Sequence, residues 1–140
     1  MRYAIFWPVI AQALLAAAVA ARLYAARVAE MRARRIPPQA IATSRTAAES
    51  LRNVAAADNF RNLFEAPVLF FAVCGALAIT DTVTAAQLVL AWAYVALRTV
   101  HSVIHVTYNR VIHRLFAYVA SMVCLYAMWA LFAWSLWKLG

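Results

Sequence analysis

The chain has 140 residues, of which 67% are hydrophobic and 13% are charged, and its formal net charge is +8 at pH 7. Helices of a soluble domain need a polar face toward water, so a chain that is this apolar throughout does not fit that class. We therefore predict one all-α integral membrane domain over residues 1–140, a four-helix bundle with up-down-up-down topology.

Four apolar segments follow one another along the chain, and each is close to or above the ~20 residues that cross ~30 Å of hydrocarbon. The predicted spans cover about residues 3–28, 60–79, 85–107 and 115–137. The first segment also resembles a secretory signal peptide, because Arg2 and an apolar run precede the small residues Ala18-Val19-Ala20. The apolar run continues to Val28, which is long for a signal core, so we expect a retained helix.

Basic residues gather around the connection between the first and second spans. Eight of the thirteen lie there: Arg22, Arg27, Arg32, Arg34, Arg35, Arg45, Arg52 and Arg61. Since Arg110 and Arg114 flank the third connection, the positive-inside rule predicts both connections, including a basic loop at about 29–46, on the cytoplasmic side and both termini outside. Contact with anionic membrane lipid explains these arginines, and no nucleic acid is expected as a partner. Brevity and the alanine and arginine content favour a bacterial inner membrane.

The start of the second helix carries a capping signal. Thr46 and Glu49 are spaced as a capping box. We therefore expect one long helix from Ala47 to Ile79, with its first three turns outside the membrane. The segment before this helix, at about residues 32–45, should be irregular, because a helix interior would not accept Pro37-Pro38.

The third and fourth helices should be joined tightly to their neighbours. Thr84 and Gln87 have the spacing of a second capping box. The connections at residues 80–83 and at Asn109-Arg110 are too short for anything but antiparallel neighbours.

The third span carries a polar stripe. Offsets of 4, 3, 4 and 3 residues place its members on one helix face: Tyr94, Arg98, His101, His105 and Tyr108. An arginine at the centre of a bilayer costs roughly 2.5 to 3.5 kcal/mol by insertion scales, so the stripe must face protein or a wet cavity.

The second helix carries a matching polar face, formed by Asp58, Arg61, Asn62 and Glu65. Helical rise places Glu65 and His101 at a common depth. We predict that the two faces are halves of one buried site for a small zwitterion. The alternative is structural: Arg61 and Glu65 form an i, i+4 pair, and the arginine and histidines of the third span only tie helices together.

Other kinds of site remain open at this stage. His101 and His105 could share a metal, with Glu65 completing a zinc-like triad, but the neighbouring arginines would oppose a cation and no metal is predicted. The two histidines could instead ligate haem. Cys74 and Cys124 lie deep within spans and have no paired spacing that suggests a metal or disulfide framework.

At these polar positions the sequence resembles a known family. The second helix reads Phe60-Arg61-Asn62-Leu63-Phe64-Glu65-Ala66-Pro67, the third contains Arg98-Thr99-Val100-His101, and Arg114 follows. This combination is similar to the membrane-associated proteins in eicosanoid and glutathione metabolism, the MAPEG family. Length and span count agree over the whole chain.

The resemblance implies a four-helix protomer, a homotrimer, and sites between protomers that open to the cytoplasmic side and bind glutathione. It implies glutathione contacts from Arg61, Asn62, Glu65 and His101, with Arg98 supporting them. Arg114 falls where catalytic family members place the arginine that holds the glutathione thiolate. A membrane glutathione transferase or glutathione-dependent peroxidase is then expected, with a lipophilic electrophile or peroxide as second substrate.

The sequence also departs from the family pattern. His105 stands where many members have tyrosine, and Leu115 leaves no hydroxyl after Arg114. Tyr108, one turn away, could substitute, and Arg110 competes with Arg114 as the partner of the thiolate. A non-enzymatic lipid-binding or assembly protein of the same fold is therefore the alternative to an enzyme.

Overall fold

A computed structural model describes residues 2–51 and 55–139, except for the side chains at 44, 48, 55–61, 63 and 64. The described residues contain helices and no strand, which confirms the predicted all-α class. The elements are η1 (Arg2–Ile5), α1 (Phe6–Arg34), η2 (Pro38–Ile41), α2 (Ser44–Ser50), α3 (Ala55–Ile79), α4 (Ala85–Val106) and α5 (Val111–Leu139).

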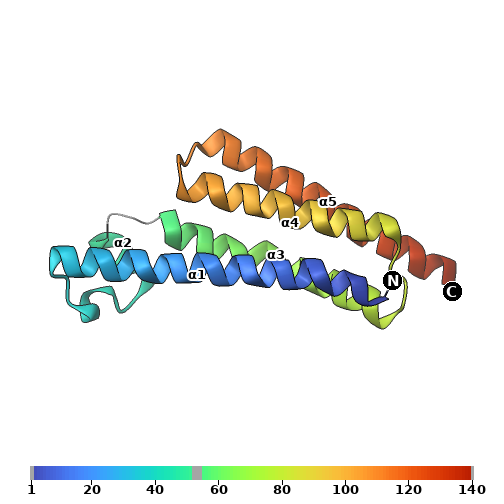
Figure 1. Cartoon of the computed structure of the whole chain (residues 1–140), viewed down its shortest axis with the longest axis horizontal. Helices are drawn as coiled ribbons and strands as arrows, with labels where there is room; N and C mark the ends of the chain where they lie inside the picture. Colours follow the sequence, from blue (N-terminus) through green and yellow to red (C-terminus); the bar gives the residue numbers. More distant parts are fainter. Residues whose placement is uncertain (1, 52–54, 140) are drawn as a thin grey trace.

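The four long helices lie side by side along one axis, and each runs opposite to the one before it (Figure 1). α1 packs mainly along α3, and α4 packs along α5. Both termini and the α3–α4 connection lie at one end (Figure 1). The C-terminus of α1, the short α2 and the α4–α5 turn lie at the other, which we call the basic end because most of the arginines are there.

In the part of the chain that the structure describes, three helical segments are long and apolar enough to cross a membrane: Arg2–Arg34, Ala85–Val106 and Val111–Leu139. The apolar part of α3 is shorter, Glu65–Ile79. With 25 residues in all, α3 is still about 38 Å long. That α3 forms the predicted second span, and that the protomers form a trimer, stay predictions.

Both short connections have the predicted form. The Thr84 hydroxyl accepts from the amide of Gln87 at 3.3 Å, and the Gln87 side chain accepts from the amide of Thr84 at 2.8 Å, so this capping box is confirmed. Asp81 and Asn109 adopt positive φ values of 54° and 46°, the left-handed conformation that ends many helices. Each turn then sends the chain back along its neighbour.

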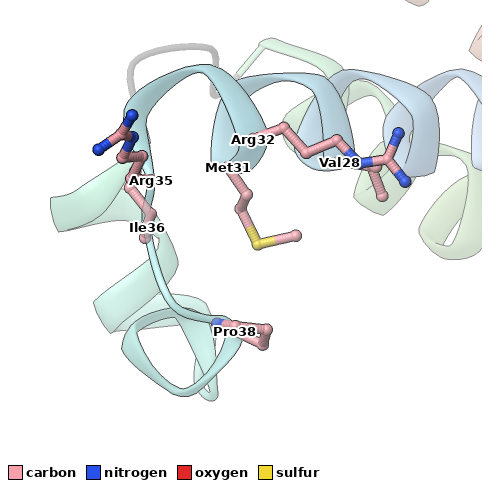
Figure 2. Close-up of a pocket in the computed structure, with 6 residues that line it drawn as sticks. All are labelled: Val28, Met31, Arg32, Arg35, Ile36 and Pro38. Carbon is pink, nitrogen blue, oxygen red and sulfur yellow. The ribbon is translucent and has the colours of Figure 1, made fainter.

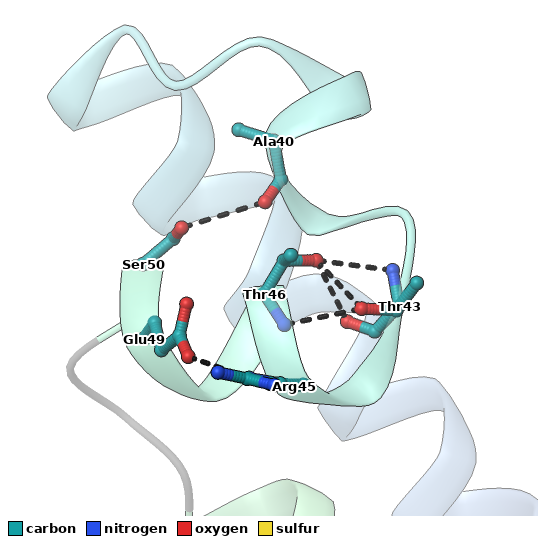
Figure 3. Close-up of polar contacts among 6 residues, drawn as sticks. All are labelled: Ala40, Thr43, Arg45, Thr46, Glu49 and Ser50. Carbon is teal, nitrogen blue, oxygen red and sulfur yellow. Dashed lines mark hydrogen bonds and ion pairs between the residues drawn. The ribbon is translucent and has the colours of Figure 1, made fainter.

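The prediction of one helix from Ala47 to Ile79 is wrong. α2 ends at Ser50, Leu51 is extended with φ −99° and ψ 140°, and α3 begins at Ala55. The Leu51 side chain is buried, and the Ser50 hydroxyl donates to the Ala40 carbonyl at 3.4 Å (Figure 3). The break thus packs α2 back on its own loop, which a straight helix could not do.

The predicted capping box also lies one turn too late. Thr43 is the N-cap: its hydroxyl accepts from the amide of Thr46, and the Thr46 hydroxyl accepts from the amide of Thr43 (Figure 3). Glu49, which the prediction used as the return acceptor, instead pairs with Arg45 at 3.1 Å. A threonine hydroxyl at the third helical position reaches the N-cap as a carboxylate does. The irregular segment also starts later than residue 32, since α1 continues to Arg34.

The apolar core lies on the side of the molecule away from the basic end. There the Tyr94 ring stacks on Phe70 with centroids 4.5 Å apart, amid residues such as Ile5, Leu77 and Met128. Toward the basic end polar groups replace this core.

Candidate functional site

The polar stripe of α4 faces the protein interior. Tyr94 and Arg98 are 0% exposed, and His101 and His105 are each 2% exposed. Tyr108 lies beyond the end of α4 and is 56% exposed. Four of the five stripe residues are therefore inside, as the cost of exposing them to lipid requires.

A cavity of about 240 Å³ opens between three helices near the basic end. Its lining residues are Asn62 of α3, His101 of α4, and Val111, Arg114, Leu115 and Tyr118 of α5. The lining therefore offers an amide, an imidazole and a guanidinium, together with the apolar side chains of Val111 and Leu115 and the ring of Tyr118. The structure brings together predicted residues from the second, third and fourth spans.

Arg98 lies directly behind this cavity. Its Nη2 donates to the backbone carbonyl of Asn62 at 2.5 Å, and its guanidinium lies 5.6 Å from the centre of the Tyr118 ring. Its Nε and Nη1 have no hydrogen-bond partner among the described residues. Both contacts of Arg98 are with residues that line the cavity, so this buried cation positions the wall.

Pro67 lies within α3, five residues after the Asn62 carbonyl that Arg98 contacts. Pro67 has no amide hydrogen, so the carbonyl of residue 63 has no helical donor at that turn. Arg98 donates to the adjacent carbonyl.

The ring of His101 is held in one tautomer. Its Nδ1 lies 3.0 Å from the backbone carbonyl of Arg114, and a carbonyl only accepts, so Nδ1 carries a proton. Its Nε2 is buried without a partner among the described residues. In the neutral ring this nitrogen is an acceptor at the cavity wall, suited to an N–H group of a ligand.

The guanidinium of Arg114 is held by two acceptors. Its Nη1 donates to Nε2 of His105 and to Oδ1 of Asn109, each at 3.0 Å. His105 and Asn109 do not line the cavity themselves. They contact the Arg114 side chain, which does line it.

Two of the predicted site residues, Glu65 and Tyr108, lie outside the cavity. Glu65 is exposed and outside the cavity lining. Tyr108 turns away, with its hydroxyl 3.3 Å from Nδ1 of His113. The side chain of Arg61, like that of Asp58 on the same predicted face, lies outside the described residues. Arg110, the competitor of Arg114, is exposed and does not line the cavity.

Two residues of the site were missed by the sequence reasoning. Tyr118 follows Arg114 by four residues on α5, so the i, i+4 spacing used for α4 could have found it. Asn109 was assigned only to the turn. Its side-chain bond to Arg114 depends on how the turn folds, and no spacing rule predicts that bond.

A second hollow of about 320 Å³ lies at the C-terminus of α1 (Figure 2). It is lined by Val28, Met31, Arg32, Arg35, Ile36 and Pro38 and shares no residue with the cavity at Arg114. Figure 2 shows the two guanidinium groups pointing away from each other. The hollow does not gather charge at one point.

Among the side chains that the structure describes, no three of His, Cys, Asp or Glu lie together so as to hold a metal ion. The alternative based on His101, His105 and Glu65 therefore lacks its third ligand. Haem ligation by His101 and His105 stays an alternative prediction.

Comparison with known proteins gives one match. The sequence model of the MAPEG family matches residues 5–134. No curated protein and no solved structure matches the chain. With nearly its whole length covered, and with apolar helices that suit a membrane, the chain belongs to the MAPEG family.

Proposed function

We propose that this protein binds glutathione in the cavity between α3, α4 and α5 and activates its thiolate for attack on a lipophilic electrophile or peroxide. The MAPEG family includes glutathione-dependent transferases. The observation that carries the proposal is the Arg114 guanidinium at the wall of a cavity that also presents His101 and Asn62. The cation of Arg114, the acceptor nitrogen of His101 and the amide of Asn62 are groups that bind a charged peptide better than they bind a lipid chain.

The chemistry requires a thiolate at neutral pH. A cysteine thiol has a pKa of ~8.5, and a neighbouring cation brings it into the range of ~3.5 to 7.5. Arg114 stays protonated, so it stabilises the anion and the thiol proton leaves to water. Val111 and Leu115 place the N-terminal turns of α5 at the cavity, where the partial positive charge of a helix N-terminus also favours an anion.

The apolar wall supports a lipid-soluble second substrate. Val111 is 65% exposed and Leu115 is 51% exposed, although both line the cavity. The wall is therefore continuous with the outer apolar face of α5. A lipophilic electrophile dissolved in the bilayer would reach the thiolate along this face without crossing water.

The rest of the glutathione site is proposed to come from a neighbouring protomer. Glu65 is exposed although it is a carboxylate on a largely apolar helix, so a homotrimer with sites between protomers would cover it. There it would pair with the glutathione amino group, and Arg61 with a carboxylate. We place this site on the cytoplasmic side of the membrane.

The test compares two arginines near the same turn. Purified protein in detergent or lipid is assayed for glutathione binding and for conjugation of a general electrophile. Arg114→Ala should lower kcat by roughly 10²-fold or more, the loss typical of a removed charge-stabilising donor, with a smaller change in glutathione affinity. Arg110→Ala, which removes an exposed arginine four residues earlier, should leave both unchanged.

The outcomes separate the alternatives. Equal losses in the two variants, or no glutathione binding by the wild-type protein, contradict the proposal. Glutathione binding without turnover in the wild type supports the non-enzymatic role, for which the absence of a hydroxyl at Leu115 is the structural argument.

A further inference from the structure

The two acceptors on Arg114 form a clamp that the family resemblance does not supply. We propose that His105 and Asn109 are positioning residues that fix the Arg114 guanidinium at the cavity and thereby set how far bound glutathione ionises. This inference rests on the proposed function, because it concerns the same thiolate.

The hydrogen bonds of the guanidinium carry the argument. Nη1 has two hydrogens, and it has two acceptors at 3.0 Å, Nε2 of His105 and Oδ1 of Asn109. Nε and Nη2 make no hydrogen bond to any described residue. A guanidinium is planar and rigid, so fixing one nitrogen from two sides also fixes the direction of the other two. Since Arg114 lines the cavity, its remaining donors are left for a ligand there.

The protonation of His105 follows from the same contact. Arginine only donates hydrogen bonds, so Nε2 of His105 must accept and the ring is neutral. The ring is 2% exposed and sits on α4 beside His101, with ring centroids 5.9 Å apart. A buried ring on a rigid helix offers its lone pair in one fixed direction. An apolar ring of the same size would fill the space and lose the bond.

The second acceptor is tied to the turn between α4 and α5. Asn109 has φ 46°, and its amide donates to the Ile104 carbonyl at 2.8 Å. Asparagine and glycine tolerate this left-handed conformation better than other residues. The residue that allows the chain to reverse therefore also holds Arg114. Glycine at 109 would keep the turn and remove the acceptor.

The clamp matters because thiolate stabilisation depends on the position of the charge. A free arginine side chain samples many rotamers, and a misplacement of about 1 Å in a reacting centre can lower the rate roughly 10²-fold. The recognition of the rest of glutathione uses other groups. Loss of the clamp should thus change thiol ionisation and kcat far more than glutathione affinity.

The experiment measures the pKa of the bound thiol directly. Wild-type protein with bound glutathione is titrated by the ultraviolet absorbance of the thiolate, and glutathione affinity is measured by calorimetry. The variants are His105→Phe, Asn109→Gly and the double variant. His105→Gln, which keeps an acceptor, is the rescue, and His113→Phe is the matched control, a histidine near the same turn that bonds Tyr108 instead.

Each single variant should raise the pKa of the bound thiol by roughly one unit, a tenfold change in its ionisation constant, and so lower the thiolate fraction at neutral pH. The double variant should lower it further, and His105→Gln and His113→Phe should stay near wild type. A wild-type thiol pKa in both single variants overturns the clamp. So does a loss in His105→Gln equal to that in His105→Phe, since the acceptor would then be irrelevant.

Failure of the clamp can be told apart from failure of the proposed function. A wild-type protein that binds no glutathione, or binds it only as the thiol, refutes the proposed function. If His105→Phe does not fold, Asn109→Gly still decides, because glycine accepts the conformation at that position.

Discussion

Replacing Arg98 with methionine should lower glutathione binding without unfolding the protein. The bond from Arg98 to the Asn62 carbonyl is charge-assisted, worth about 1.5 to 3 kcal/mol, and the contact with Tyr118 is worth up to ~2 kcal/mol. Against these stand roughly 2.5 to 3.5 kcal/mol for holding an arginine within the bilayer, and two guanidinium nitrogens without a described partner. The free energy gained from the contacts of Arg98 and the cost of burying its charge are therefore of similar size.

We therefore expect Arg98→Met to change the free energy of unfolding by less than about 2 kcal/mol, in either direction, as when buried charges are exchanged for apolar groups of similar volume. Glutathione affinity should fall about tenfold, because Asn62 and Tyr118 lose the group that positions them. Reversible unfolding in mixed micelles measures the free energy of unfolding, and calorimetry measures the glutathione affinity.

Tyr94→Phe is the matched control for this variant. Its hydroxyl is buried without a partner among the described residues, one turn from Arg98 on the same stripe, but Tyr94 does not line the cavity. The glutathione affinity of Tyr94→Phe should therefore equal that of the wild-type protein. If Arg98→Met instead destabilises the fold by more than about 3 kcal/mol and leaves affinity intact, Arg98 is structural glue between helices and the reasoning fails.

Three further predictions concern single groups. Gln12 on α1 is fully buried with neither amide atom bonded to a described residue, so Gln12→Leu should stabilise the protein by about 1 to 3 kcal/mol, and a lower unfolding midpoint would contradict this. Thr43→Ala removes the N-cap of α2 and should cost about 0.5 to 2 kcal/mol locally, seen as faster amide exchange in α2 with unaltered conjugation. Tyr108→Phe should leave kcat unchanged, since Tyr108 contacts His113, and a large loss would restore Tyr108 to the site.

Periodicity predicted the interior stripe of α4 correctly because burial of polar groups in a membrane protein follows directly from helical spacing. The same rule failed at Tyr108. α4 ends at Val106, and Thr107 takes φ −104° and ψ −95°, so the next residue leaves the helical face. Helical spacing places residues on one face only while the helix continues, and the residue at which a helix ends is difficult to predict from sequence.

Local capping rules also reached a limit. The box at Thr84 was identified because Gln87 is the only acceptor at the right distance, whereas Thr43, Thr46 and Glu49 offered two overlapping boxes. The box that forms is that of Thr43 and Thr46, and spacing alone does not distinguish it from the other. The bond from Arg114 to Asn109 is a tertiary contact, because it exists only once the turn has folded.

One contact from α1 bears on the electric field at the cavity. Arg22 Nη2 donates to the Val106 carbonyl at 3.0 Å, at the last residue of α4. The C-terminus of a helix carries about half a negative charge on its unpaired carbonyls, and that dipole end would repel an anion bound beside His101. The guanidinium from the first helix offsets it. A helix with no residue in the cavity lining thus adds a positive charge close to it, and we expect that neutralising Arg22 weakens anion binding from a distance.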